Sequence, residues 1–295
     1  MHTASLHDGP LVRIFDVRCR PEHPDCSGEE CVSRHHIVFP RAGVFVKHVR
    51  GRKVTVDPSL VLFFTAGEPY RVSHPVAGGD DCTVFAYRDE VLIEALAAVD
   101  PRVQDRPEAP FARNHGRAEA SALLPERALR HRLVRGEAGT LEIEETSLAL
   151  LGTVAADAVA DTPPMPCRPR AASLRLRRDW VEATKLRLAA RPEADLTLAA
   201  LAREVGCSPF HLARLFRADQ GLPIHQYQLR LRLALALERL LDGSSNLLSL
   251  ALDLGFASHS HFSAAFRRTF GLTPSAYRRI ATRRRLGEMR KILTV

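Results

Sequence analysis

Two stretches of this 295-residue chain repeat one another. Residues 196–221 read LTLAALAREVGCSPFHLARLFRADQG, and residues 245–271 read SNLLSLALDLGFASHSHFSAAFRRTFG. In each stretch, apolar residues recur at helical spacing up to a glycine. A second apolar stripe then follows a serine, which is a favoured N-cap residue. The repeat therefore predicts two pairs of helices, and a tight glycine turn joins the members of each pair.

The two stretches stay in register over their whole length. Gly255 repeats Gly206 after 49 residues, and Gly271 repeats Gly221 after 50 residues, so the second turn carries one extra residue. Two helices joined by a tight turn form a helix-turn-helix, whose second helix can enter the major groove of DNA. A single match would be weak because such helix pairs are common, but two in register predict a DNA-binding module.

The charge of the chain is divided between its two halves. The net charge is +8 overall. Residues 168–295 hold 23 Lys and Arg against 10 Asp and Glu, whereas residues 1–167 hold 19 against 24. The positive charge is therefore confined to the half that carries the repeat, as expected for a module that binds a polyanion.

At its C-terminal end the sequence resembles the DNA-binding domain of the AraC/XylS family of bacterial transcriptional regulators. The resemblance covers about residues 178–282. It rests most strongly on Gly255, Phe256, Ser258, Phe262, Phe266, Arg267, Gly271, Pro274, Tyr277 and Arg278. It implies an all-α domain with two helix-turn-helix motifs, which we place at 178–285, followed by a basic tail at 286–295.

The resemblance also implies roles for individual side chains. The positions that match base-reading positions of the family are Phe210, Ala213, Arg214, His259, Ser260 and Ser263. The residues expected at the DNA backbone are Ser208, Pro209, Arg217, Ser258, Arg267 and Arg268. An arginine can bridge the two acceptors of a guanine. The alternatives are a surface salt bridge for Arg214 and core packing for Phe210.

The segment between the two motifs must set their spacing. Residues 229–237 alternate apolar with other residues, which alone would indicate a strand. Leu, Ala and Arg are good helix formers, however, and Gly243 lies where a helix would end. We expect one long helix over 223–241 that places both recognition helices in successive major grooves, about 34 Å apart.

The N-terminal half carries the signals of a β domain. Short runs rich in Val, Ile and Phe, separated by turn residues, predict strands over about 11–88 in a sandwich or jelly-roll barrel. Apolar stripes predict a helical pair over about 117–160. We therefore expect a multidomain protein: a mainly-β, cupin-like sensor or dimerisation domain at 1–160, a proline-rich linker at 161–177, and the DNA-binding domain. The helical pair either packs on the barrel or mediates self-association.

Catalytic and metal chemistry find little support in the sequence. Metal-binding cupins use a His-x-His pair, and none occurs in the strand region, so we expect no enzyme activity and no cofactor. A loose group of soft ligands, Cys19, His23, Cys26 and Cys31, is a weak candidate for a metal or thiol-redox sensor. Its spacing matches no Cys-x-x-Cys motif, so unremarkable loop residues are the alternative.

The sequence predicts a sequence-specific DNA-binding transcriptional regulator. Its expected partners are double-stranded DNA, RNA polymerase, a small-molecule effector whose contact residues stay unknown, and a second copy in a homodimer. No apolar run approaches the ~18 residues of a membrane span, so we expect a cytoplasmic protein with no membrane partner. Activator and repressor both stay open as outcomes of its binding. The alternatives are a cupin-type or cysteine-based enzyme or sensor fused to a DNA-binding module, and a regulator that needs no ligand.

Overall fold

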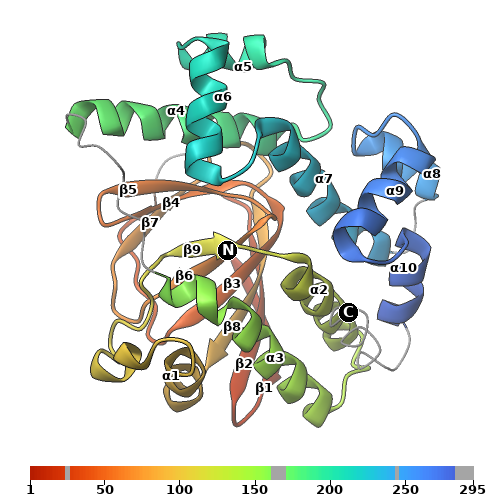
Figure 1. Ribbon diagram of the computed structural model, residues 1–295. Helices are drawn as coiled ribbons and strands as arrows, with labels where there is room; N and C mark the ends of the chain where they lie inside the picture. The colour runs from red at the N-terminus through yellow and green to blue at the C-terminus, as the bar shows by residue number, and fades with distance from the viewer. Residues whose placement is uncertain (24–26, 161–170, 243–245, 283–295) are drawn as a thin grey trace.

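The computed structural model describes residues 1–23, 27–160, 171–242 and 246–282 (Figure 1). Two antiparallel sheets with helices form the N-terminal half, and the C-terminal half is helical with two helix-turn-helix units. This confirms the predicted multidomain fold class. The predicted tail 286–295, residues 161–170 of the predicted linker, and Cys26 lie outside the described residues. No helix in the described ranges has the length and apolar character needed to cross a membrane.

The N-terminal half is built on two sheets. The larger has the strand order β1-β2-β8-β3-β6-β9 and the smaller has the order β5-β4-β7. Every pairing is antiparallel. The strands are β1 His2–Asp8, β2 Val12–Cys19, β3 His36–Gly43, β4 Phe45–Val49, β5 Arg52–Val56, β6 Leu60–Phe64, β7 Tyr70–Ser73, β8 Asp80–Tyr87 and β9 His115–Arg117.

The strands β3, β6 and β8 of the larger sheet are buried on both faces, which explains their nearly continuous apolar sequences. Successive side chains of a strand point to opposite faces. Along β3, Val38 packs toward the smaller sheet, whereas Ile37 and Phe39 pack toward the helices. Those helices are α1 Asp89–Ala97, α2 Ala120–Val134 and α3 Thr140–Val159, with a short 3-10 turn at Pro101–Asp105.

Several N-terminal elements were missed or misplaced by the sequence analysis. The edge strand β1 precedes the predicted strand region and carries few apolar residues, so its periodicity gave no signal. The helix α1 was not predicted. Arg117 was expected to begin a helix but ends β9, a short strand that pairs with β6. Short strands of mixed polarity depend on their partners, which a single sequence does not reveal.

The C-terminal half consists of seven helices in the described ranges. They are α4 Ala171–Ala190, α5 Leu198–Val205, α6 Pro209–Gln220, α7 Ile224–Leu241, α8 Leu247–Asp253, α9 His259–Phe270 and α10 Pro274–Thr282. The pairs α5–α6 and α8–α9 are the two helix-turn-helix units. The single helix α7 runs between them, as expected, so helix propensity prevails over the alternating pattern (Figure 1).

The two halves share one apolar core. The helix α2 contacts α7, α9 and α10, and α4 contacts β5. Buried residues of α2 and α3 belong to the same apolar cluster as Leu237, Phe262 and Tyr277 of the C-terminal half. The helix α4 begins at Ala171, within the segment expected to be a linker. The N-terminal half therefore lies directly against the helices that carry the repeat.

Candidate DNA interface

The first recognition helix, α6, is defined at both ends by local chemistry. The Ser208 hydroxyl accepts a hydrogen bond from the His211 backbone N–H at 3.3 Å, and Pro209 occupies the first turn. Gly221 ends the helix in a left-handed conformation. One face is buried through Leu212 and Phe216. The opposite face is consequently fixed in orientation and turned to solvent.

That solvent face carries the residues expected to meet DNA. Phe210 is 79% exposed, so the alternative that it packs in the core is wrong. Arg214 and Arg217 are exposed and Ala213 is half-buried. Among the described residues, no ion pair or hydrogen bond of Arg214 is found, so the salt-bridge alternative lacks a partner there. The roles of these side chains in base reading stay predictions.

The second recognition helix, α9, repeats this construction. The Ser258 hydroxyl accepts from the His261 backbone N–H at 3.1 Å, and Gly271 ends the helix. Phe262, Ala265, Phe266 and Phe270 form its buried face.

The outward side of α9 is more polar than that of α6. His259, Ser260, Arg267 and Arg268 are exposed, and Ser263 is half-buried. The Ser263 Oγ lies 3.2 Å from His259 Nε2, one turn away, so this contact orients the imidazole. The arginines Arg267 and Arg268 are in the last turn of the helix, and their contact with phosphates stays a prediction.

Arg232 of α7 forms hydrogen bonds next to both helix-turn-helix units, and the sequence analysis did not predict this role. Arg232 donates to the carbonyl oxygen of Gly255 at 2.7 Å, in the turn of the second unit. It also donates to the carbonyl oxygens of Pro192 at 2.6 Å and Ala194 at 3.2 Å, in the loop that leads into the first unit. The spacing of the two units is therefore fixed by side-chain contacts as well as by helix length.

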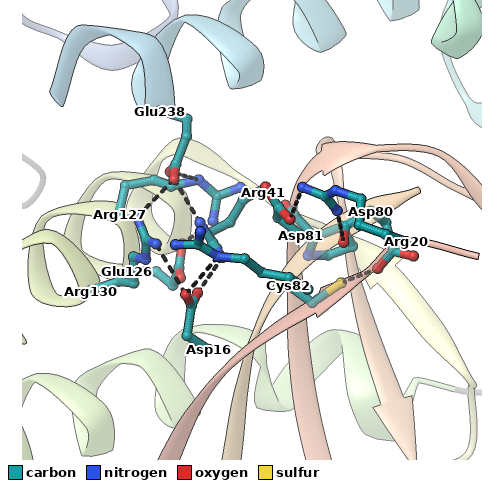
Figure 2. A network of polar contacts seen from close by, with 12 residues as sticks. Asp16, Arg20, Arg41, Asp80, Asp81, Cys82, Glu126, Arg127, Arg130 and Glu238 are labelled. Carbon is teal, nitrogen blue, oxygen red and sulfur yellow. Dashed lines mark hydrogen bonds and ion pairs between the residues drawn. The ribbon is translucent and has the colours of Figure 1, made fainter. Parts of the chain in front are cut away.

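A buried ionic cluster joins α7 to the N-terminal half (Figure 2). Glu238 of α7 accepts from Arg41 of β3 at 2.7 Å and from Arg130 of α2 at 2.9 Å, and Asp16 of β2 binds the same two arginines. We call Asp16, Arg41, Arg127, Arg130 and Glu238 the Glu238 cluster. Burial alone would raise the pKa of Glu238, but the guanidinium groups of Arg127, Arg41 and Arg130 hold it below its ordinary value of 4.5.

Further polar contacts link the halves outside this cluster. The Tyr227 hydroxyl of α7 donates to Asp57, whose other oxygen accepts from the Ser59 hydroxyl at 2.6 Å. The Thr55 hydroxyl of β5 donates to the carbonyl oxygen of Glu182 in α4 at 3.1 Å. The Tyr227–Asp57 and Thr55–Glu182 contacts were not predicted, because the members of each pair are more than 100 residues apart in the sequence.

The cysteine and histidine residues of the N-terminal half are arranged differently from the predicted loose group. His23 and Cys31 are exposed. Among the described residues, the one group of three or more His, Cys, Asp and Glu whose ligand atoms all lie within 4.8 Å consists of Cys19, His74 and Asp80. Only Cys19 belongs to the predicted set.

Lys47 is a further buried group that the sequence gave no reason to select. It lies between the two sheets, where its Nζ donates to the Phe63 carbonyl oxygen at 3.1 Å and lies 3.3 Å from the centre of the Phe64 ring. Burial lowers the pKa of Lys47 to about 7.

The fold and the two uncovered recognition helices define a helix-turn-helix DNA-binding protein. A family model described as a helix-turn-helix domain matches residues 201–280. Regulatory protein SoxS from Salmonella typhimurium is 36% identical over 86 residues, which are 29% of this chain and 80% of SoxS. The chain belongs to the AraC/XylS family of DNA-binding transcriptional regulators.

Other matches are shorter relative to the matched proteins or lower in similarity. Regulatory protein PocR from Salmonella typhimurium is 37% identical over 84 residues, 28% of this chain and 28% of PocR. The chain thus matches little more than a quarter of that relative. A crystal structure of unsaturated fatty acid bound ToxT from Vibrio cholerae covers 92% of this chain and 95% of its own, at 14% identity and a TM-score of 0.35.

Proposed function

We propose that this protein is a sequence-specific transcriptional regulator that reads duplex DNA with α6 and α9 together. The main support is that α6 and α9 share the same three features: a serine N-cap, a buried apolar face and a solvent-exposed opposite face. Phe210, Ala213 and Arg214 read one major groove, and His259, Ser260 and Ser263 read the next. Ser208, Pro209, Arg217, Ser258, Arg267 and Arg268 contact the backbone.

The test is selection of a binding site by the full chain from random duplexes. Fluorescence anisotropy then compares the selected duplex with a scrambled one at several salt concentrations. Specific binding exceeds non-specific binding by about 10³-fold or more for such proteins, and affinity falls steeply with salt. Equal affinity for selected and scrambled duplexes would remove the proposal.

The N-terminal half, in this proposal, controls how the DNA-binding half is presented. The Glu238 cluster supports it, because buried charges from β2, β3 and α2 hold the helix that spaces the two units. A small-molecule effector acts by altering this contact, and the regulator activates transcription in the cytoplasm by contacting RNA polymerase. No catalytic role is assigned to either half.

Glu238→Gln tests this coupling. Removing one member of a buried ion pair costs about 3 kcal/mol or more of the free energy of unfolding, because the arginines lose their counter-charge. Glu204→Gln is the control, since Glu204 pairs with Arg187 on the surface and contributes less than about 1 kcal/mol. We expect Glu238→Gln to change the affinity of the protein for the selected duplex and Glu204→Gln to leave that affinity unchanged. Unchanged affinity would contradict the coupling.

Acid pH probes the same contact. The pKa of Glu238 and that of Asp16 are both lowered in the folded protein, from ordinary values of 4.5 and 3.8. Their stabilisation is therefore present above those values and is lost as the pH falls below them. We expect the free energy of unfolding to fall on acidification below about pH 4.5, and to fall less in Glu238→Gln, as measured by urea titration.

We propose that the homodimer forms through α3 rather than α2. The helix α2 packs against α7, α9 and α10, whereas α3 exposes Leu141 by 69% and Leu148 by 40%. Sedimentation velocity of Leu148→Glu tests this, with Val99→Glu, an exposed position near α1, as the control. A wild-type monomer, or a dimer unaffected by Leu148→Glu, would overturn it.

A further inference from the structure

Three side chains that are far apart in the sequence meet where strands of the N-terminal half begin and end. Cys19 ends β2, Asp80 begins β8, and the two are cross-strand partners. His74 follows β7, and its Nε2 lies 2.6 Å from Asp80 Oδ1. The sulfur, an imidazole nitrogen and a carboxylate oxygen all lie within 4.8 Å of one another. We propose that Cys19, His74 and Asp80 form a binding site for a thiolate-preferring divalent metal ion of the Zn²⁺ class.

The backbone around these residues is fixed without using their side chains. Arg20 donates to the carbonyl oxygen of Cys19 at 2.8 Å. It also donates to the carbonyl oxygen of Asp80 at 3.0 Å and to the Asp81 carboxylate at 2.7 Å (Figure 2). Gly79 has φ +70°, and a Cβ there would lie 1.9 Å from the Cys19 carbonyl oxygen. The thiol, imidazole and carboxylate thus remain available on a rigid support.

The charge balance of Asp80 favours a cation. Asp80 is 6% exposed and His74 is 7% exposed. Within the described part of the chain, no Lys or Arg forms an ion pair with the Asp80 carboxylate, because Arg20 pairs with Asp81 instead. Buried carboxylates are normally paired with a cation or coordinate a metal. Among the described residues, the Asp80 carboxylate contacts His74 Nε2 and the Cys82 thiol, and the Cys19 sulfur lies within 4.8 Å of the same group.

Cys82 supplies a supporting contact. It is 4% exposed, and its thiol donates to Asp80 Oδ2 at 3.2 Å (Figure 2), the carboxylate oxygen that His74 does not contact. Outer contacts of this kind are common around metal ligands and affect affinity by about 10–100-fold.

The chemistry of the three donors selects the class of metal. Thiolate and imidazole suit Zn²⁺ and similar ions, whereas Ca²⁺ and Mg²⁺ require oxygen ligands. Tetrahedral bonds of about 2.0–2.3 Å place ligand atoms about 3.3–3.8 Å apart, so the His74–Asp80 pair must open by roughly 1 Å. On binding, Cys19 loses its thiol proton to solvent and coordinates as thiolate.

Cobalt(II) titration of the full chain, after chelator treatment under reducing conditions, tests the site. We expect one Co²⁺ per chain, a near-ultraviolet thiolate-to-cobalt charge-transfer band, and loss of the band when Zn²⁺ is added. The exposed His259 and His261 can bind cobalt without producing that band, so the band reports the cysteine site.

Variants locate the site. Cys19 is half-buried, and serine is nearly isosteric with cysteine. We therefore expect Cys19→Ser to abolish the band while leaving the circular dichroism spectrum unchanged. Cys82→Ala keeps the band and weakens binding by about 10–100-fold. The control Cys31→Ser, at an exposed cysteine, keeps both the band and the affinity. Absence of the band in the wild type, its persistence in Cys19→Ser, or its loss in Cys31→Ser would overturn the proposal. Asp80→Asn provides a second loss-of-binding variant.

Discussion

The two helix-turn-helix units are alike in local structure and different in their surroundings. Gly206 and Gly255 share the left-handed conformation, with φ +77° and +78°. A Cβ at Gly206 would meet nothing within 4 Å, whereas one at Gly255 would lie 2.4 Å from the Glu193 carbonyl oxygen. The first unit packs against α4, whereas α9 of the second unit packs against α2. The repeat thus encodes the local fold, and the residues that differ determine what each unit contacts.

Substituting Gly206 and Gly255 should give the largest difference between the two units in the free energy of unfolding. Alanine in a left-handed conformation costs about 1–2 kcal/mol, which is all that we expect for Gly206→Ala. Gly255→Ala adds overpacking against backbone and should cost about 3–5 kcal/mol in total. Urea unfolding of both variants measures the difference. Equal losses would show that the second turn is not held against the loop before α5.

Substituting Tyr227 and Tyr277 should give a smaller difference between the two units in the free energy of unfolding. Tyr227 and Tyr277 occupy equivalent positions of the repeat and are both buried. The Tyr227 hydroxyl donates to Asp57, whereas the Tyr277 hydroxyl has no hydrogen-bond partner among the described residues. We expect Tyr227→Phe to cost about 1–3 kcal/mol of the free energy of unfolding and Tyr277→Phe to cost almost none. Comparable effects from the two substitutions would argue against the Asp57 contact.

The arginines of the recognition helices separate base reading from phosphate contact. Arg214→Ala should weaken binding to the selected duplex by about 1–3 kcal/mol and leave scrambled DNA almost unaffected. Arg267→Ala should weaken both duplexes alike and reduce the salt dependence by about one phosphate contact. Anisotropy titrations on both duplexes provide the measurement. Identical behaviour of the two variants would remove Arg214 from the base-reading set.

The sequence predicted the C-terminal half well because its signals are local. Ser208 and Ser258 cap their helices as expected, and glycines end both α6 and α9. In the N-terminal half, β6 lies within the predicted strand region and is a continuous apolar run, Leu60–Phe64. The polar edge strand β1 and the short strand β9 were missed, because their stability depends on pairing partners.

Contacts between distant residues could not be read from one sequence. Glu238 contacts Arg41, which is 197 positions away, and no local pattern distinguishes Glu238 from other polar helix residues. The predicted group around Cys19 contained only its sequence neighbours, whereas strand pairing places Asp80 of the adjacent strand β8 beside it. Sheet order and register decide such neighbours, and neither is encoded in local periodicity.

The helix α7 is 18 residues and about 27 Å long, and we propose that it holds both recognition helices at one fixed spacing. Inserting about five base pairs, half a turn of DNA, between the two halves of the selected site tests it. The account predicts that the affinity of the full chain falls close to that for scrambled DNA. Affinity unchanged by the insertion would contradict it, because two independently tethered units would tolerate the altered spacing.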